Sequence, residues 1–303
     1  MTVIFSIKSP FRSPYELHRL EFGEAHPDFP TVAIVAGIHG NELNGIHALN
    51  LLASVLRLQK IKGKVLLYPI VNTFGADECR KRWPFENQDI NTIFPGDPQG
   101  TTAERIAYAL YESISEAQVC IDVHSGASHV REIPQVRTPL SGIELEYARD
   151  MALPVIWRRS GEHLELKGFV GSCRARGQIS FRITGGRGTT LDASLSTKMA
   201  DGLSLMLAKR GIMRQRNQME IIADVSNKEV HSYRSPLGGF FVPEIRVGEI
   251  IQTGRLLGYI QNPIGGARLD EIRSKTKGVV MSLRANPMIH AEELLVRIAE
   301  IPI

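Results

Sequence analysis

The sequence predicts an α/β domain over residues 1–216 and a smaller all-β domain over residues 217–303. In the first part, buried-type strands alternate with segments whose apolar residues recur at helical spacing, which is typical of a mostly parallel sheet covered by helices. After Arg216 the apolar runs become short and are separated by turn-forming segments such as SPLGG and NPIGG, as in a small all-β unit. At roughly 100–200 residues per domain, a chain of 303 residues fits two domains.

The elements of the first part follow from its hydrophobic pattern. An unbroken apolar run predicts a strand over residues 31–37, and the amphipathic stretch after a Gly-rich turn predicts a helix over residues 42–60. A linker is expected over residues 214–218, where the pattern changes. The same criteria predict further strands over 64–71, 117–123, 151–157 and 178–184, and helices over 101–117 and 191–210.

The all-β part contains an approximate internal duplication. Residues 239–241 (GFF) align with 278–280 (GVV), and residues 256–257 (LL) align with 294–295 (LL), with one gap between them. Each half alone exposes an apolar face that the other half can cover. Two similar hairpin-rich halves therefore predict a pseudo-symmetric β-sandwich.

Charge and cysteine content argue against several classes of protein. The 36 Lys and Arg against 32 Asp and Glu give a net charge of +4 without a basic block, so nucleic-acid binding gains little support. Three cysteines without a CxxC pair make no disulfide framework, and no run approaches the roughly 18 apolar residues of a membrane span. We expect a cytoplasmic protein with no nucleic-acid or membrane partner, and a homo-oligomer is compatible with the sequence.

Metal-ligating residue types occur at the ends of two predicted buried strands. The segment GIHGNE follows the first strand and carries His39 and Glu42, three residues apart across a turn into a helix, where both side chains can reach one ion. His124 ends a later strand, and Asp122, two residues earlier, lies on the same side of an extended segment. We predict a zinc site formed by His39, Glu42 and His124, with Asp122 orienting the imidazole of His124 or a nearby polar group.

Each of these residues taken alone has a simpler interpretation. A histidine or glutamate at a helix start is most often a cap or a solvated side chain. The combination of GxHGxE after one strand with DxH after another favours the metal site. Three histidines outside these motifs, His47, His129 and His163, are expected to be surface or packing residues.

At this point the chain resembles the succinylglutamate desuccinylase and aspartoacylase family, which has the zinc carboxypeptidase-like fold. Besides GIHGNE and DVH, residues 72–76 (NTFGA) resemble the family's Asn-Pro-x-x-Ala segment, and residues 89–96 (DINTIFPG) resemble its Asp-Leu-Asn-Arg-x-Phe-Pro-Gly. Residues 134–137 (PQVR) and 185–186 (GG) also find counterparts. The resemblance implies a mixed sheet flanked by helices, and a C-terminal barrel-sandwich-like module of the bacterial deacylase-like branch.

The resemblance also implies the chemistry. Zinc held by His39, Glu42 and His124 would hydrolyse the amide of a small N-acylated amino acid, because zinc lowers the pKa of bound water toward about 7 and polarises the carbonyl. The carboxylate of such a substrate needs cationic or hydrogen-bonding partners. The cluster at 80–82 (RKR), followed by Asp89 and Asn91, is placed to supply them.

Within that cluster, Arg82 is predicted to be the family's first substrate arginine. Alignment does not separate Arg82 firmly from Arg80, and a solvated basic loop is the simpler alternative. Asp89 and Asn91 are predicted to bind substrate with it.

Two positions depart from the family pattern. Thr92 stands where the family motif has arginine, so substrate binding must differ. Alignment also places Ile183 at the position of the family's general base, a glutamate two residues before a paired glycine, and isoleucine cannot accept a proton. Losing a positioned general base costs roughly 100- to 10,000-fold in rate. The stand-in candidates are Glu132, Glu162 and Glu165.

The leading hypothesis is therefore a zinc-dependent amidohydrolase, acting on carbon–nitrogen bonds other than peptide bonds, whose chemistry is altered by the missing glutamate. The first alternative is a zinc-binding family member that has lost hydrolysis and serves as a ligand- or partner-binding protein. The second alternative is an acyl-carrier or biotinyl-like tail. Such modules present a modifiable lysine at a hairpin tip, and the corresponding turns at 242–245 (VPEI) and 282–285 (SLRA) contain none.

Overall fold

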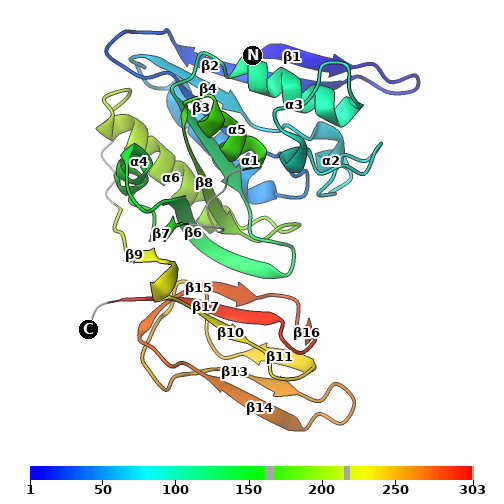
Figure 1. Ribbon diagram of the computed structural model, residues 1–303, viewed down its shortest axis with the longest axis vertical. Coiled ribbons are helices and arrows are strands. Elements are labelled where there is room, and N and C mark those ends of the chain that lie inside the picture. The colour runs from blue at the N-terminus through cyan, green and yellow to red at the C-terminus, as the bar shows by residue number, and fades with distance from the viewer. Residues whose placement is uncertain (161–166, 215–218, 302–303) are drawn as a thin grey trace.

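A mixed β-sheet with helices on both faces forms the larger part of the protein, and a strand-rich part follows it toward the C-terminus (Figure 1). The computed structural model describes residues 1–160, 167–214 and 219–301. The predicted fold class is confirmed by this arrangement. No helix in these ranges is long and apolar enough to cross a membrane.

The large sheet has a parallel centre and antiparallel flanks. Strands β3, β4, β5 and β8 run parallel, whereas β2 pairs with β4 and β6 pairs with β8 in the antiparallel sense. The order is β1-β2-β4-β3-β5-β8-β6, with β7 beside β6 and β9 beside β7. The strands are β1 (Thr2–Ile7), β2 (Tyr15–Gly23), β3 (Val32–Ala36), β4 (Lys64–Tyr68), β5 (Val119–His124), β6 (Val130–Pro139), β7 (Val155–Arg159), β8 (Ile179–Gly186) and β9 (Ala223–Ser226).

Helices cover the sheet in two layers (Figure 1). The first layer packs on the face that holds Ile121, Val123 and Ile183, and the second packs on the opposite face around Cys120. The first layer consists of α1 (Leu43–Arg57), α4 (Ile143–Met151) and α6 (Ala193–Lys209). The second consists of α2 (Thr73–Asp77), α3 (Thr102–Ser113), α5 (Gly168–Ala175) and the short 3-10 helix η1 (Ile90–Ile93).

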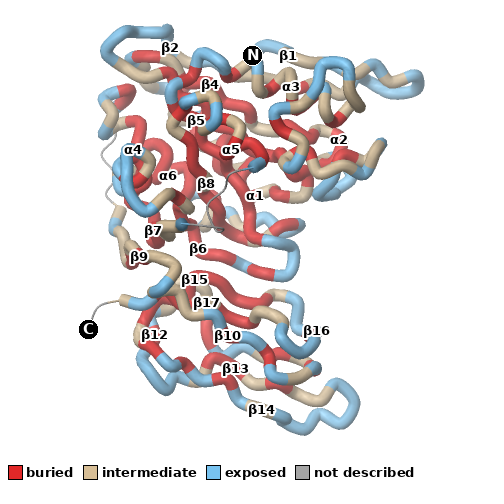
Figure 2. The backbone as a smooth tube through the Cα atoms, in the orientation of Figure 1, coloured by how far each residue is buried: buried red, intermediate tan, exposed pale blue. Residues whose placement is uncertain are grey.

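Because side chains alternate along a strand, the two faces of β5 have different roles. Val119, Ile121 and Val123 point into the core under α1 and α6. Asp122 and His124 therefore point to the other face, at the carboxyl end of the strand. All residues of β5 are buried, which explains its continuous apolar pattern (Figure 2).

The C-terminal part is a two-sheet sandwich with internal pseudo-symmetry. One sheet has the order β14-β13-β11-β16, and the other places β10, β17, β15 and β12 in the equivalent order. The two predicted halves thus exchange their short strands, because β12 pairs with β15 and β16 pairs with β11. The strands are β10 (Val230–Arg234), β11 (Gly239–Pro243), β12 (Ile250–Ile251), β13 (Leu256–Gln261), β14 (Arg268–Arg273), β15 (Gly278–Arg284), β16 (Met288–Ile289) and β17 (Leu294–Glu300), with the 3-10 helix η3 (Asn227–Glu229) before them.

The two parts share hydrogen bonds and a core. Strand β15 pairs with β6 in the antiparallel sense, so the second sheet of the sandwich continues the large sheet. Between them lies a small apolar cluster in which Ile133 and Val155 meet Val279, Met281 and Ala299. The predicted boundary between residues 216 and 217, and most of the predicted linker, lie outside the described residues and stay predictions.

A helix that the sequence analysis did not predict shortens one of the predicted strands. Residues 143–151 form α4, so the strand expected over 151–157 begins only at Val155. The helix ends because Ala152 has a left-handed backbone, with φ of 49°, and Pro154 follows it.

Candidate functional site

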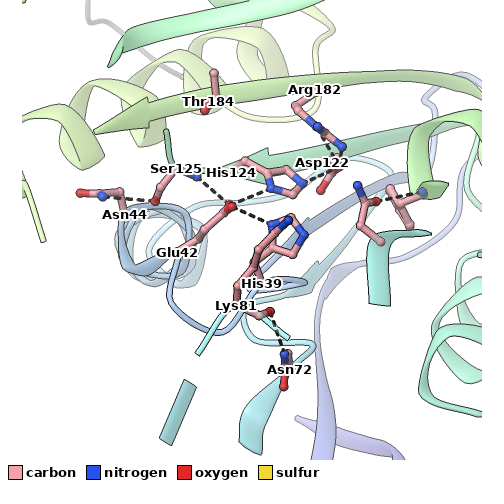
Figure 3. A network of polar contacts seen from close by, with 12 residues as sticks. His39, Glu42, Asn44, Asn72, Lys81, Asp122, His124, Ser125, Arg182 and Thr184 are labelled. Atoms are coloured by element: carbon pink, nitrogen blue, oxygen red, sulfur yellow. Dashed lines mark hydrogen bonds and ion pairs between the residues drawn. The ribbon is translucent and has the colours of Figure 1, made fainter. Parts of the chain in front are cut away.

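Three buried side chains converge at the carboxyl ends of β3 and β5 (Figure 3). His39 follows β3, Glu42 is the residue before α1, and His124 ends β5. One ligand atom from each lies within 4.8 Å of the others. The Nδ1 atoms of His39 and His124 each lie 2.7 Å from an oxygen of the Glu42 carboxylate. The structure thus brings together the three residues predicted to bind metal.

The remaining ring nitrogen of each histidine contacts a second carboxylate. His39 Nε2 lies 2.9 Å from Asp89 Oδ1, and His124 Nε2 lies 2.7 Å from Asp122 Oδ2. An acceptor at Nε2 keeps the proton there and leaves the Nδ1 lone pair available to an ion. Two imidazole nitrogens and one carboxylate are a set that zinc-type sites use, with positions left for water or substrate. The residues present therefore fit a metal ion.

The negative charge of Glu42 and the positive charge of His124 stabilise each other. Burial raises the pKa of Glu42, but the two histidines outweigh burial, so its pKa lies far below the ordinary value of 4.5. Burial and the Arg182 guanidinium lower the pKa of His124, whereas Asp122 and Glu42 raise it more, to about 9. Without a metal, the fold therefore holds a positive charge on His124 between these carboxylates.

A close approach of two backbones builds the turn that carries His39 and Glu42. A Cβ atom on Gly40 would lie 2.1 Å from the carbonyl carbon of Gly75 and 2.3 Å from the nitrogen of Ala76, in α2. Asn72 fixes α2 in this position, because its side chain accepts a hydrogen bond from Gly75 N and its own N–H donates to Gly37 O. Only glycine fits at position 40.

A cavity of about 370 Å³ opens over the cluster. Its cationic side chains are Lys81, Arg137 and Arg182, each of which faces a carboxylate. The partners are Asp89 for Lys81, Glu132 for Arg137 and Asp122 for Arg182. The lining residues are His39, Asn41, Glu42, Lys81, His124, Ser125, Gly126, Ala127, Ser128, His129, Arg137, Arg182, Thr184 and Gly188.

The residues predicted to bind substrate lie elsewhere. Arg82 is exposed, donates to Asn87 O at 3.0 Å, and is not among the described residues that line the cavity. Arg80 is exposed and pairs with Glu78. The next residue, Trp83, is fully buried. Arg82 thus lies outside this cavity, and its contact with substrate stays a prediction.

Asn91 and Asp89 have structural roles in this site. The Asn91 side chain accepts a hydrogen bond from Phe169 N at 3.2 Å, which connects η1 to α5. Asp89 contacts His39 and Lys81, so it orients a ligand histidine. Asp122 contacts His124 in the corresponding way.

Position 183 does not face the cavity. Ile183 is fully buried in the core between the sheet and α1, α4 and α6, next to Val123 and Val136. Its neighbour Thr184 lines the cavity, because adjacent side chains on β8 point to opposite faces. The expectation that a carboxylate at position 183 would lie beside the metal is wrong for this fold. Among the described residues, the cavity-facing side of β8 offers Arg182 and Thr184.

Of the three stand-in bases, the structure describes Glu132. Its buried carboxylate accepts two hydrogen bonds from Arg137 Nη2, at 2.8 and 3.0 Å, and one from the Thr184 hydroxyl at 3.3 Å. It thus lies behind the cavity wall. Glu162 and Glu165, together with His163, lie outside the described residues.

Sequence reasoning missed most of the cavity wall. Arg137 and Arg182 were not assigned, although both lie on strands and alternate with apolar core residues, which is a detectable signal. His129, expected on the surface or in packing, is exposed and lines the cavity. His47 is half-buried on α1, outside the lining.

Comparison with known proteins gives consistent matches. Residues 28–209 match the model of the succinylglutamate desuccinylase/aspartoacylase catalytic domain. One relative, the N-alpha-acetyl-L-2,4-diaminobutyric acid deacetylase of Halomonas elongata, is 26% identical over 290 residues, which cover 90% of this chain and 82% of the relative.

Two solved structures share the fold over almost the whole chain. A succinylglutamate desuccinylase/aspartoacylase from Rhodobacter sphaeroides superposes with a TM-score of 0.78 at 21% identity, covering 96% of this chain and 91% of that chain. The product-bound ectoine utilization protein EutE (DoeB) from Ruegeria pomeroyi gives a TM-score of 0.77 at 20% identity, covering 95% and 90%.

Proposed function

The chain belongs to the succinylglutamate desuccinylase/aspartoacylase family, and from this we propose that it is a zinc-dependent deacylase that hydrolyses the amide bond of a small N-acylated amino acid. One observation carries the proposal: two histidines share one carboxylate at the base of a cavity whose wall carries three cations. The deacetylase activity named for the Halomonas relative supports the same reaction class.

In this proposal His39, Glu42 and His124 hold the zinc ion. When bound, zinc lowers the pKa of water toward about 7 and polarises the amide carbonyl. Asp89 and Asp122 keep the Nε2 protons of the two histidines in place, and Ser125 N donates to Glu42 at 2.9 Å, which fixes the carboxylate.

Arg137 is the best-placed group for the substrate carboxylate. Its Nε atom is buried and has no hydrogen-bond partner among the described residues, although its Nη2 is held by Glu132. A guanidinium with free N–H groups can bind a carboxylate by charge-assisted hydrogen bonds. The Thr184 hydroxyl donates a hydrogen bond to Glu132, so its oxygen can accept a hydrogen bond from a substrate N–H or from water in the cavity.

A second candidate function rests on the composition of β8. The described cavity-facing residues of this strand include no carboxylate that could serve as a general base. A family member of this kind would hold zinc and bind an N-acyl amino acid or a partner without hydrolysing it. The two candidates differ in turnover and agree in metal content.

The test combines elemental analysis with an amine-release assay on a panel of N-acetyl and N-succinyl amino acids. We expect one zinc per chain and hydrolysis of at least one N-acetyl compound. The triple variant His39→Ala, Glu42→Ala, His124→Ala should lose both, whereas the control His47→Ala, on α1 outside the cavity, should keep both. Unchanged metal content in the triple variant would refute the site. Full zinc without turnover of any compound would favour the second candidate.

A further inference from the structure

Behind the cavity wall, two arginines lie close to one carboxylate, and the same two lie, together with Arg159, over one indole ring. Both oxygens of Glu132 accept hydrogen bonds from Arg137 Nη2, and Arg297 Nη1 lies 4.0 Å from Oε1 of the same carboxylate. The Arg137 and Arg297 guanidinium groups lie 5.5 and 5.6 Å from the centroid of the Trp157 ring. We call Glu132, Arg137, Trp157 and Arg297 the interdomain cluster.

The cluster crosses from the catalytic sheet into the β-sandwich. Arg137 and Glu132 lie on β6 and Trp157 lies on β7, directly opposite Arg137. Arg297 lies on β17, and Ser282 on β15 pairs with both Glu132 and Arg297, so the three residues form one row across three neighbouring strands (Figure 1). The β-sandwich thus supplies a cation at the back of the cavity wall.

The charges of the interdomain cluster explain how it holds the Arg137 side chain in place. The Arg137 and Arg297 guanidinium groups both lie near Glu132, and attraction to this anion offsets the repulsion between the two cations. The Glu132 side chain is only 6% exposed, so its charge is little screened and attracts both. Trp157 supplies a flat surface that stacks with both cations and donates its own N–H to Asn227, which fixes the ring.

From this geometry we propose that Arg297, from the β-sandwich, is a positioning residue for substrate binding: acting through Glu132 and Trp157, it orients the Arg137 guanidinium toward the carboxylate of the substrate. The proposal rests on the proposed function for the identity of the ligand. It assigns to the β-sandwich a part in substrate affinity, although no described residue of the β-sandwich lines the cavity.

The test compares Arg297→Met with Arg297→Lys. Methionine keeps the apolar stem and removes the charge, so KM for the N-acetyl amino acid that wild-type protein hydrolyses best should rise roughly tenfold, with kcat within about twofold. Lysine should restore most of the affinity. The control Arg255→Met removes an exposed β-sandwich arginine that contacts Glu249 and Glu244 O, and should leave KM unchanged.

A binding measurement separates this proposal from the proposed function. Succinate, titrated calorimetrically into the zinc-loaded protein, should bind wild type and bind Arg297→Met roughly tenfold more weakly. Arg137→Met should weaken binding at least as much, and adding Arg297→Met to it should change nothing further, because both act through one guanidinium. If wild type hydrolyses no N-acyl amino acid, the proposed function fails, and the succinate series still decides the role of Arg297.

Three results would overturn the proposal. The first is unchanged KM and succinate affinity in Arg297→Met. The second is a fall in kcat at constant KM, which would place Arg297 outside substrate binding. The third is no succinate binding to wild type, or additive effects of the two methionine substitutions. Glu132→Gln provides a second approach if Arg297→Met does not fold, because it removes the shared anion from the catalytic side and should also raise KM.

Discussion

His124 is held between carboxylates on both sides of its ring, which makes metal binding compete with a proton. Its pKa is raised from 6.5 to about 9 in the metal-free fold by Asp122 and Glu42, against burial and Arg182. The proton stabilises the metal-free protein fully below about pH 6.5, and this contribution is lost as the pH rises through about 9. An incoming ion must displace it.

Zinc affinity should therefore increase as the pH rises through this range. Competition with a chromophoric chelator at a series of pH values measures the effect, and the slope should approach tenfold per pH unit for one displaced proton. A flat affinity across the same range would show that His124 is already neutral in the metal-free protein.

At position 183, burial decides what a carboxylate would do. Ile183→Glu places an ionisable group in a fully buried apolar core, so we expect a loss of more than about 3 kcal/mol in the free energy of unfolding and no gain in hydrolysis. The control Ile183→Val should cost about 1 kcal/mol. Urea unfolding of both variants gives the comparison. A stable Ile183→Glu protein with faster hydrolysis would mean that position 183 reaches the cavity after all.

At the scale of elements, His39 and Glu42 are positioned by the turn between β3 and α1, whereas His124 is the last residue of β5. The β3–α1 turn passes so close to α2 that Gly40 has no room for a side chain. Gly40→Ala should displace α2 or the turn, cost about 1–3 kcal/mol, and lower the zinc content, because His39 and Glu42 flank the position.

Gly265→Ala is the matched control for Gly40→Ala. A Cβ atom there meets nothing within 4 Å and the backbone is not left-handed, so stability and zinc content should stay at wild-type levels. Thermal unfolding and elemental analysis test both variants. Full zinc in a stable Gly40→Ala protein would argue against a rigid contact between the two turns.

At the scale of the whole molecule, the β-sandwich adds strands and apolar cover to the large sheet. Val279, Met281 and Ala299 cover Ile133 and Val155, and β15 occupies the hydrogen-bonding edge of β6 near the cavity. A chain that ends after Arg214 loses β9, this apolar cover and that strand partner. We expect it to bind a hydrophobic dye and to aggregate through the open edge.

Size-exclusion chromatography of the truncated chain measures its aggregation, and dye fluorescence measures its exposed apolar surface. The full-length protein is the reference for both. A monomeric truncated chain with one cooperative unfolding transition would show that the α/β part folds independently of the β-sandwich.

Much of this protein is determined by short stretches of its sequence. The strand, turn and helix around GIHGNE, the DVH at the end of β5 and the duplicated halves of the tail all follow from patterns within a few neighbouring residues. That His39, Glu42 and His124 lie together could be predicted because the first two lie on the turn after one buried strand, His124 ends another, and these strands, β3 and β5, are adjacent and parallel.

Tertiary structure decided which other side chains reach the cavity. Arg82 and Asn91 resemble substrate-binding residues in sequence yet point elsewhere, whereas Arg137 and Arg182 reach the cavity from β6 and β8. Position 183 shows the physical reason: a shift of one residue along a strand moves a side chain to the opposite face. Strand order and the pairing of distant segments decide which face of β8 meets the cavity. They also place β17 behind the cavity. Such pairing between distant segments exists only in the folded chain.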